Sequence, residues 1–443
     1  VGTGEGTVLL ANTSANTYSG GTSVNYGTLK LDAATTNLTP STGTITVTSS
    51  AIFDIAGYSV ASPISLGGGT VVSSTGSGGA ISGGITLTSV SYIGASAGAV
   101  LTINTTPITI TVNSPIFGTR AYRGTVVLDT SLTSPINTWV RAAYGVLKLG
   151  NATALNAATS FVVDANGTLD ITNSGASTIS GVISDAVLNS SRLILTKAGS
   201  GTLTISADNS YTGATTISGG TLQVGGSGRL GGGTYAGNIA IANTAILKYS
   251  SSSSQTLSGT ISGQGSITKD TDTTSTLTLS GNNTYSGGTT VSSGTLKAGS
   301  SGITGPPATG PFGTGSVTVS ATNAVLDLNG QSISNLLTLN GTGLSSGGAI
   351  INSNVTAATA SGNITLGSDS SIGGTNNFTL SGIISDGSNT YALTKVNAGI
   401  TTLTGANTYD GTTTILGGTL ALSGSGTLGN TTSLLTITSG TLD

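Results

Sequence analysis

The stretch "NTYSGGTTVSSGTLKA" (Asn283–Ala298) decides the fold, because this chain of 443 residues contains it several times. Gapless copies run from Asn16 to Leu31, from Asn209 to Val224 and from Asn407 to Leu422. In each copy the tyrosine precedes the leucine of "GTL" by 11 residues. A spacing held over four copies is typical of a repeat protein in which each unit packs mainly on its neighbours.

Two further motifs accompany this stretch. The sequence "SGxIS" precedes a Thr-Lys pair three times, and the lysines are Lys197, Lys269 and Lys395. A fifth, irregular copy, "INTWVRAAYGVLKLG" (Ile136–Gly150), has Trp139 in the place of the tyrosine and three residues fewer before its leucine. The repeating unit is therefore about 75 residues where it is compact.

The residues between these motifs predict short strands. Apolar residues alternate with Ser or Thr over four to six positions, and no stretch shows a useful helical period. Gly-Gly, Asn-Gly and Ser-Gly pairs interrupt the strands at short intervals and favour tight turns. Strands this short build a core only by stacking, so we expect an all-β fold. The usual crossover preference makes it a right-handed parallel β-helix (β-solenoid), an elongated rod in which residues 1–443 form a single continuous solenoid of irregular repeats.

The composition excludes several classes of function. Charged residues make up 6% of the chain and the net charge is −3, so no field attracts phosphates, and we expect no nucleic-acid partner. The chain has no Cys and no His, which excludes thiolate metal sites and nucleophiles activated by histidine. We predict no catalytic residue, no metal and no cofactor.

The same composition indicates an exported protein. Absence of Cys suits passage through an oxidising compartment. No apolar run approaches the roughly 20 residues that span a bilayer, so we expect no membrane insertion of this chain. The opening "VGTGEGTVLL" lacks the features of a signal peptide. We therefore expect the chain outside the cell or on its outer surface, after export and signal removal.

The combination of "SGNNTYSGGTTVSSGTLKAG" (Ser280–Gly299) with "AVLDLNGQSI" (Ala324–Ile333) resembles the passenger-associated transport repeat of Gram-negative autotransporters. The resemblance implies an extracellular β-helix that presents adhesive or other surfaces. It also implies a repeat associated with efficient export and folding of the passenger. One departure from the family pattern is that we expect no C-terminal translocator barrel, because the sequence stops at "SGTLD". Either the barrel was cleaved or this is a different exported relative.

The repeated asparagines and aromatic residues are the first candidate site. Amide and hydroxyl side chains can bond neighbouring backbone at a corner, and an aromatic ring can lie on the adjacent coil. We therefore expect structural corners rather than ligand contacts at Asn16, Tyr18, Asn209, Tyr211, Asn283, Tyr285, Asn407, Tyr409 and Trp139.

A second candidate is a cluster of cationic and aromatic residues between Ser114 and Leu149. Such groups bind sugars or partner proteins, although an irregular repeat also needs bulky filler. The candidate partner-binding residues, beside Trp139, are Phe117, Arg120, Tyr122, Arg123, Arg141 and Tyr144.

The apolar residues near both ends of the sequence are the third candidate. An uncapped solenoid exposes an apolar ladder and unpaired strand edges that recruit other chains. Unlike ends that meet head to tail generate a filament. The residues expected at such an end-to-end contact are Val8, Leu9, Leu10, Leu434, Leu435, Ile437 and Leu442.

Three functions remain open at this point. The first is a non-enzymatic structural protein whose copies stack head to tail into an extracellular fibre. The second is an autotransporter-type adhesin or stalk that binds a surface glycan or protein through its loops. The remote third is a polysaccharide-active enzyme, which needs paired carboxylates. The nearest acidic pair, Asp270 and Asp272, is expected in a solvated turn, and Asp32, Asp170 and Asp327 at the edges of stacked coils.

Overall fold

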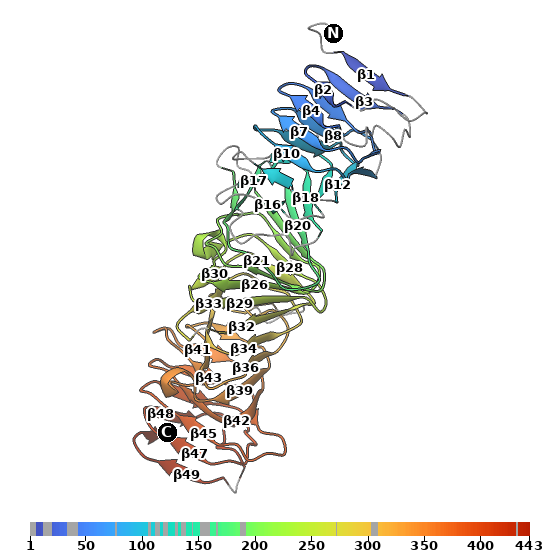
Figure 1. The fold of residues 1–443 in the computed structure, drawn as a ribbon. Helices are drawn as coiled ribbons and strands as arrows, with labels where there is room; N and C mark the ends of the chain where they lie inside the picture. Colours follow the sequence, from blue (N-terminus) through green and yellow to red (C-terminus); the bar gives the residue numbers. More distant parts are fainter. Residues whose placement is uncertain are drawn as a thin grey trace. The chain divides into compact units, whose positions relative to one another are not determined.

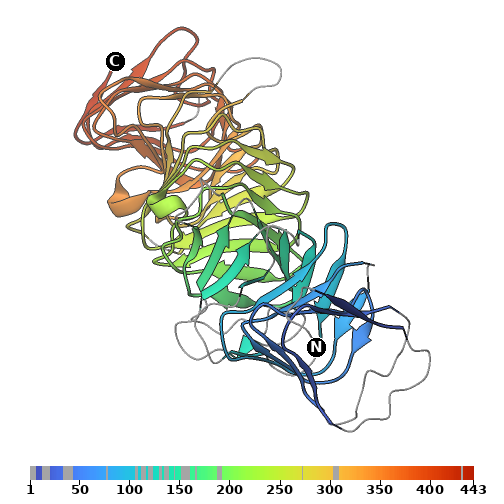
Figure 2. The same ribbon diagram turned by 90° about the horizontal axis from the view of Figure 1, so that it is seen from above.

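The computed structural model describes residues 6–11, 20–32, 43–75, 78–104, 108–110, 116–117, 123–128, 132–133, 139–143, 145–150, 160–164, 167–186, 192–271, 273–302, 309–430 and 433–443. The chain divides into two compact units, Val1–Thr216 and Ile217–Asp443. In each unit short strands stand one above the next, and Figures 1 and 2 show this stacking from two directions.

The first unit has three columns of parallel strands. The first column is β1 (Thr7–Leu10), β3 (Thr28–Leu31), β5 (Ile52–Asp54), β8 (Thr70–Ser73), β11 (Tyr92–Ala95), β14 (Ile116–Phe117), β17 (Trp139–Ala143), β19 (Ser160–Asp164) and β22 (Ile183–Asp185). The second is β2 (Thr22–Val24), β4 (Ile45–Thr48), β7 (Ile64–Gly67), β10 (Ile85–Leu87), β13 (Ile108–Ile110) and β16 (Leu132–Thr133). The third contains β6 (Ser59–Val60), β9 (Gly79–Ile81), β12 (Val100–Ile103), β15 (Thr125–Leu128), β18 (Val146–Leu149), β20 (Thr168–Thr172) and β23 (Ile194–Ala198). Strand β21 (Ser177–Ile179) pairs with β24 (Thr202–Ile205), and β25 (Thr215–Ile217) contains the boundary between the units.

Successive coils of this unit visit the three columns in turn. Strands β4, β5 and β6 make one coil, and β7, β8 and β9 make the next. Ile45 is in register with Ile64, and Ile64 with Ile85, and all three are 1% exposed. Alternate residues of a strand point inward, so the alternation in the sequence becomes continuous apolar ladders inside the stack.

The second unit repeats this stacking. Its largest set of paired strands is β26 (Thr221–Gly226), β27 (Thr234–Tyr235), β29 (Ile246–Ser251), β30 (Gln255–Leu257), β32 (Ser266–Lys269), β33 (Thr276–Leu279), β34 (Thr289–Val291), β35 (Gly294–Ala298), β36 (Val317–Val319), β37 (Ala324–Asp327), β39 (Leu337–Gly341), β40 (Ile350–Ile351), β42 (Ile364–Gly373), β44 (Ile384–Ser385), β45 (Leu393–Lys395), β47 (Thr413–Ile415) and β49 (Leu435–Ile437). A second set is β38 (Ser332–Ile333), β41 (Ala358–Ala360), β43 (Phe378–Leu380), β46 (Ile400–Leu403), β48 (Thr419–Leu422) and β50 (Thr441–Leu442). Strand β28 (Ile239–Ile241) pairs with β31 (Ile261–Gly263).

Buried apolar ladders fill the second unit as well. Leu277, Leu296, Leu326 and Ile350 follow one another in register and are fully buried. The expected all-β, parallel solenoid is therefore confirmed. The helical segments among the described residues are the 3-10 turns η2 (Gly231–Gly233) and η3 (Leu344–Ser346), and both project from the same side of this unit in Figures 1 and 2. That one continuous solenoid runs through both units stays a prediction.

Candidate functional site

The repeated asparagine joins the two repeated motifs of the sequence across neighbouring coils. Its Oδ1 accepts a hydrogen bond from the backbone N–H of the isoleucine in "SGxIS" on the preceding coil. The donor and acceptor residues are Ile183 and Asn209 (2.9 Å), Ile261 and Asn283 (2.7 Å), and Ile384 and Asn407 (2.8 Å). These asparagines are 0–4% exposed. Each therefore satisfies a backbone group that would otherwise be buried without a partner.

The amide nitrogen of the same side chain points onward along the stack in two copies. Asn283 Nδ2 donates to the carbonyl of Pro311 at 2.6 Å, and Asn407 Nδ2 donates to Thr427 at 2.7 Å. In the third copy Asn209 Nδ2 donates to Ala207, two residues back, at 2.8 Å. Asn283 and Asn407 thus clamp three coils together through one side chain.

The tyrosine of the repeat is a core residue. Tyr211, Tyr285 and Tyr409 are 0% exposed. Each phenol shares a hydrogen bond with the threonine four residues later, and the oxygen pairs are Tyr211–Thr215 (2.9 Å), Tyr285–Thr289 (2.5 Å) and Tyr409–Thr413 (2.7 Å). Burial raises the pKa of Tyr409 to about 12, against a smaller lowering by Thr413.

The ring also lies against the next coil. A Cβ on Gly313 would come within 2.9 Å of the Tyr285 ring, and a Cβ on Gly429 within 3.0 Å of the Tyr409 ring. Both glycines have positive φ angles, 63° and 82°. A side chain at either position would be strained and would collide with the ring below, so the tyrosine requires a glycine on the following coil.

Two of the three corners add an aspartate after "SGxIS". Asp185 Oδ2 accepts from the backbone N–H of Thr212 at 2.9 Å and from its hydroxyl at 2.7 Å. Asp386 Oδ2 accepts from the backbone N–H of Asp410 at 3.1 Å. Among the described residues the buried Oδ1 of Asp386 has no hydrogen-bond partner. The residue after the repeated tyrosine is therefore bound by a carboxylate in both corners.

The lysine of each Thr-Lys pair is buried, which the sequence did not suggest. Lys197, Lys269 and Lys395 are 0–1% exposed. Lys395 Nζ donates to the carbonyls of Val396 (2.8 Å), Asn397 (2.9 Å) and Gly417 (3.2 Å), and Lys197 Nζ donates to Ala198 and Gly199. Burial lowers the pKa of Lys197 and lowers that of Lys395 to about 8.

These lysines cap one type of turn. The residue two positions after each lysine has a positive φ, namely Gly199 (76°), Thr271 (77°) and Asn397 (62°). This bend allows the carbonyls after Lys197 and Lys395 to face the ammonium group. The Thr-Lys pair is therefore a second corner of the solenoid, in which an ammonium group binds backbone carbonyls.

Acidic residues at the coil edges pair with lysines of the preceding coil. Three pairs occupy register partners on adjacent strands: Lys30–Asp54 (3.7 Å), Lys148–Asp170 (3.9 Å) and Lys297–Asp327 (3.5 Å). Burial raises the pKa of Asp170, and the charge of Lys148 opposes this. Partly exposed pairs of this kind contribute about 0–1 kcal/mol each, so they mainly favour the correct register.

Asp270 lies beside Lys248, with 2.9 Å between Lys248 Nζ and Asp270 Oδ2. Burial raises its pKa, but hydrogen bonds from Ser250, Thr271 and Lys248 and the charge of Lys248 together hold it below its ordinary value. Asp272, which was expected with Asp270 in a solvated turn, lies outside the described residues. Within the described ranges, no three acidic, His or Cys side chains form a group that could hold a metal ion.

Much of the proposed partner-binding cluster falls outside the described part of the chain, as do Asn16 and Tyr18 of the first repeat. The residues of this cluster that lie outside the described residues are Arg120, Tyr122 and Tyr144. Phe117 lies on β14, in register with Ala142 on β17. Trp139, the expected counterpart of the repeated tyrosine, is the first residue of β17, whereas the three buried tyrosines lie outside strands. Arg123 is exposed.

The apolar residues of the outermost strands are partly exposed. Val8 and Leu9 on β1 are each 52% exposed, and Leu10 is less so. At the other edge, Leu434, Leu435 and Ile437 are 67%, 37% and 48% exposed, and Leu442 is partly covered. Leu10, Ile437 and Leu442 continue rows that are buried one coil further in, because their register partners Leu31, Ile415 and Leu420 are 0–1% exposed.

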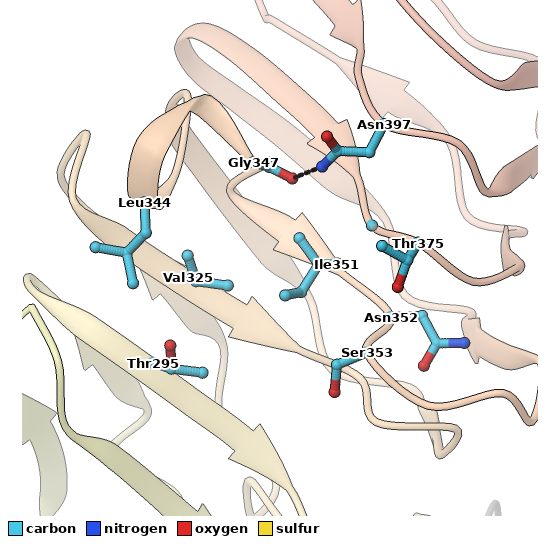
Figure 3. Close-up of a pocket in the computed structure, with 11 residues that line it drawn as sticks. Thr295, Val325, Leu344, Gly347, Ile351, Asn352, Ser353, Thr375 and Asn397 are labelled. Atoms are coloured by element: carbon cyan, nitrogen blue, oxygen red, sulfur yellow. Dashed lines mark hydrogen bonds between the residues drawn. The ribbon is translucent and has the colours of Figure 1, made fainter.

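A pocket of about 210 Å³ lies beneath the η3 turn of the second unit. Figure 3 shows Leu344 reaching over it from this turn, Val325 and Ile351 on the strands between, and Ser353 and Thr375 on the other side. Asn397 Nδ2 donates to the carbonyl of Gly347 at 2.9 Å and ties the turn to a later coil. Sequence reasoning missed this pocket.

Comparison with known families agrees with this geometry. The model of the passenger-associated transport repeat matches residues 3–31, 195–224, 274–298 and 393–422. Four segments of the chain are thus similar to passenger-associated transport repeats. Each matched segment ends where an aligned copy of the sequence ends, so the transport repeat contains the asparagine and tyrosine of the corner.

The transport repeats and the solenoid together support an autotransporter passenger-type protein. Such repeats imply export to the cell surface. Among the described residues, no helix is long and apolar enough to cross a membrane. No curated protein and no solved structure matches the chain.

Proposed function

We propose that the chain is a non-enzymatic extracellular structural protein whose copies stack head to tail into a fibre at the cell surface. The observation that carries this proposal is the change in burial along one inward row. Ile415 on β47 is 0% exposed, and its register partner Ile437 on β49 is 48% exposed. An apolar row that is half open to water is stabilised when another coil covers it.

The occupant proposed for this row is the β1 edge of a second copy. Val8 and Leu9 on β1 are also half exposed, and the unpaired backbone of an outer strand adds hydrogen bonds to the apolar contact. Charged side chains that would oppose the contact are scarce at both edges. Because the two edges differ, repeated addition gives a filament rather than a closed ring.

Electron microscopy and sedimentation of the purified 443-residue chain test the proposal. We expect unbranched filaments from the unaltered chain and from the control T436K, whose residue lies on the same strand between Leu435 and Ile437. Lys395 lies in the same row and is satisfied by the carbonyls of its turn, in which Asn397 has a positive φ angle. Ser439, the corresponding residue after Ile437, has no positive φ angle, so we expect the lysine of I437K to lack such partners and the particles to stay dispersed. Monomers of the unaltered chain at high concentration, or filaments that persist in I437K, would refute the fibre.

A second candidate function is an adhesin or stalk that binds a glycan or a protein through surface features. The uncharged pocket under η3 favours it, as does the exposed Arg123 within the cationic and aromatic cluster. A binding assay on a glycan array and on cells tests this function. Arg123→Ala then reports on the cluster, and an unchanged signal in that variant would remove the cluster from consideration.

A further inference from the structure

The pocket beneath η3 is built at one place where the regular coil is interrupted. The chain leaves β39, forms η3 and returns in β40. Within this excursion Gly343, Ser345 and Ser346 have positive φ angles of 72°, 50° and 58°. A left-handed residue other than glycine costs about 1–2 kcal/mol, so two in succession persist only where other contacts hold them.

Hydrogen bonds hold the excursion in place. The N–H of Gly348 donates to Thr342 at 2.8 Å, and the N–H of Gly347 donates to Leu344 at 2.8 Å. Asn397, 50 residues later, donates to the carbonyl of Gly347. The turn is therefore tied both to itself and to a later coil, and the pocket exists before any ligand arrives.

The floor of the pocket is more apolar than the same face elsewhere. Thr276, Thr295 and Val325 follow one another in register, so an aliphatic residue replaces the threonines at the pocket. In the neighbouring row, Lys297, Asp327 and Ile351 are register partners on successive strands, so an isoleucine takes the place of the ion pair at the pocket. Val325 is 3% exposed although this row faces outward, and Leu344 from η3 lies over it as a wall (Figure 3).

The lining is uncharged throughout. The eleven lining residues are Thr295, Val325, Leu344, Gly347, Gly348, Ile351, Asn352, Ser353, Gly374, Thr375 and Asn397. An uncharged, partly apolar pocket gives no compensation for removing a phosphate, a carboxylate or a cation from water. The side chains of Ser353, Thr375 and Asn397 stand at its rim (Figure 3). The Ser353 hydroxyl donates to Asp327 and the Asn397 amide donates to Gly347, so the oxygens of both side chains remain to accept hydrogen bonds from a ligand.

We propose that this pocket binds one neutral sugar unit of a surface glycan. The volume suits a ligand smaller than the drug-sized molecules that fill pockets of about 300–1,000 Å³. A neutral pyranose has an apolar C–H face for Val325 and Ile351 and hydroxyl edges for the polar rim. The proposal rests on the second candidate function, binding of a glycan, and is independent of the fibre.

Saturation-transfer NMR on the full chain tests it. The probes are the methyl glycosides of glucose, galactose, mannose, N-acetylglucosamine and fucose, with glucuronate and N-acetylneuraminate as charged counterparts. We expect at least one neutral glycoside to bind and the charged sugars not to bind. Absence of binding by every neutral probe would overturn both the pocket and the glycan-binding function.

Two variants then locate the binding. T295W fills the floor, and the control T276W places the same side chain at the register partner on the preceding coil, outside the pocket. We expect T295W to weaken the glycoside by about tenfold or more, and T276W to leave its affinity within about twofold. Binding that survives T295W would overturn the pocket while leaving glycan binding elsewhere on the chain intact.

A further variant, Val325→Thr, keeps the shape of the floor. It tests the pocket even if the tryptophan variant T295W fails to fold. A hydroxyl in place of a methyl group removes apolar contact with the sugar face. We expect weaker binding by about threefold with an unchanged circular dichroism spectrum and melting temperature within a few degrees. Unchanged affinity in V325T would contradict the assignment of Val325 to the floor.

Discussion

The corners at Asn283 and at Asn407 use the same asparagine, tyrosine and threonine, yet they differ after the "SGxIS" motif. At the second corner the carboxylate of Asp386 accepts the N–H of Asp410 at 3.1 Å. At the first, the carbonyl of Gly263 accepts the corresponding N–H of Ser286 at 3.0 Å. In both corners the backbone N–H after the tyrosine donates a hydrogen bond, and the acceptor is either a side-chain or a main-chain oxygen. Repeats can therefore diverge wherever the backbone has another acceptor.

The largest expected effect is at the asparagine, for which neither corner offers a substitute. Asn283→Ala leaves the N–H of Ile261 and the carbonyl of Pro311 buried without partners, and we expect about 3 kcal/mol less stability. Asn407→Ala should lose a similar amount. Denaturant unfolding measures both, with the exposed Asn282→Ala as control at about zero. A loss below about 1 kcal/mol at both corners would contradict the three-coil clamp.

Lys395, which precedes the second corner, should make stability depend on pH. The pKa of Lys395 is about 8 in the folded chain, against 10.5 for an ordinary lysine. Between these values the unfolded chain binds more protons, so stability rises with pH. Relative to Lys395→Met, the unaltered chain should gain about 2 kcal/mol between pH 8 and pH 10.

Denaturant unfolding at several pH values measures this gain. Lys297→Met, a partly exposed lysine paired with Asp327, serves as the control and should keep the pH dependence of the unaltered chain. If Lys395→Met showed that same dependence, burial of the ammonium group would not be its cause.

The tyrosine hydroxyl should matter equally at the two corners. Tyr285→Phe and Tyr409→Phe each leave a buried threonine hydroxyl without its partner, for an expected loss of about 1.5 kcal/mol. Absorbance titration gives a second measurement, because the raised pKa of Tyr409 keeps it un-ionised when exposed tyrosines titrate near pH 10. If Tyr409→Phe reduced the absorbance change near pH 10 relative to the unaltered chain, Tyr409 would ionise together with the exposed tyrosines and would be open to solvent.

The smallest expected effect sharpens the comparison at Asp386. At the corner of Asn209, the residue after the tyrosine is Thr212, whose hydroxyl donates to Asp185. Asp410 stands in that place at the corner of Asn407, and Asp386 Oδ1 has no partner among the described residues. Asp410→Thr supplies a donor and removes a nearby carboxylate, but it also removes the exposed hydrogen bond from Asn430 to Asp410, so we expect a net gain below about 1 kcal/mol. Thermal unfolding measures it, with the exposed Asp32→Thr as control, and a destabilised Asp410→Thr would contradict the analogy between the two corners.

The sequence predicted the fold because the solenoid uses local rules. Alternation of Thr with Leu in segments such as Thr276–Leu279 indicates strands, and the fixed spacing from Tyr285 to Leu296 indicates stacked coils. The chemistry of the asparagine also led us to expect side-chain hydrogen bonds to neighbouring backbone. The partners in those bonds could not be predicted, because they are backbone atoms on other coils.

The buried lysines and the pocket escaped prediction for physical reasons. Lysine is rarely buried, and the acceptors of Lys395 are carbonyls that no residue type reveals. The pocket gathers residues from Thr295 to Asn397, and the turn that roofs it, "GLSSGG" (Gly343–Gly348), reads as an ordinary linker. Only the three-dimensional register brings these segments together.

The asparagine clamp gives the stack a direction. Asn407 accepts from a coil 23 residues earlier and donates to one 20 residues later, so each clamp joins the coil behind it to the coil ahead through opposite ends of one amide. Order in such an array propagates between nearest neighbours. A chain that enters the exterior gradually can therefore fold as a moving front, in which every completed coil is the template for the next.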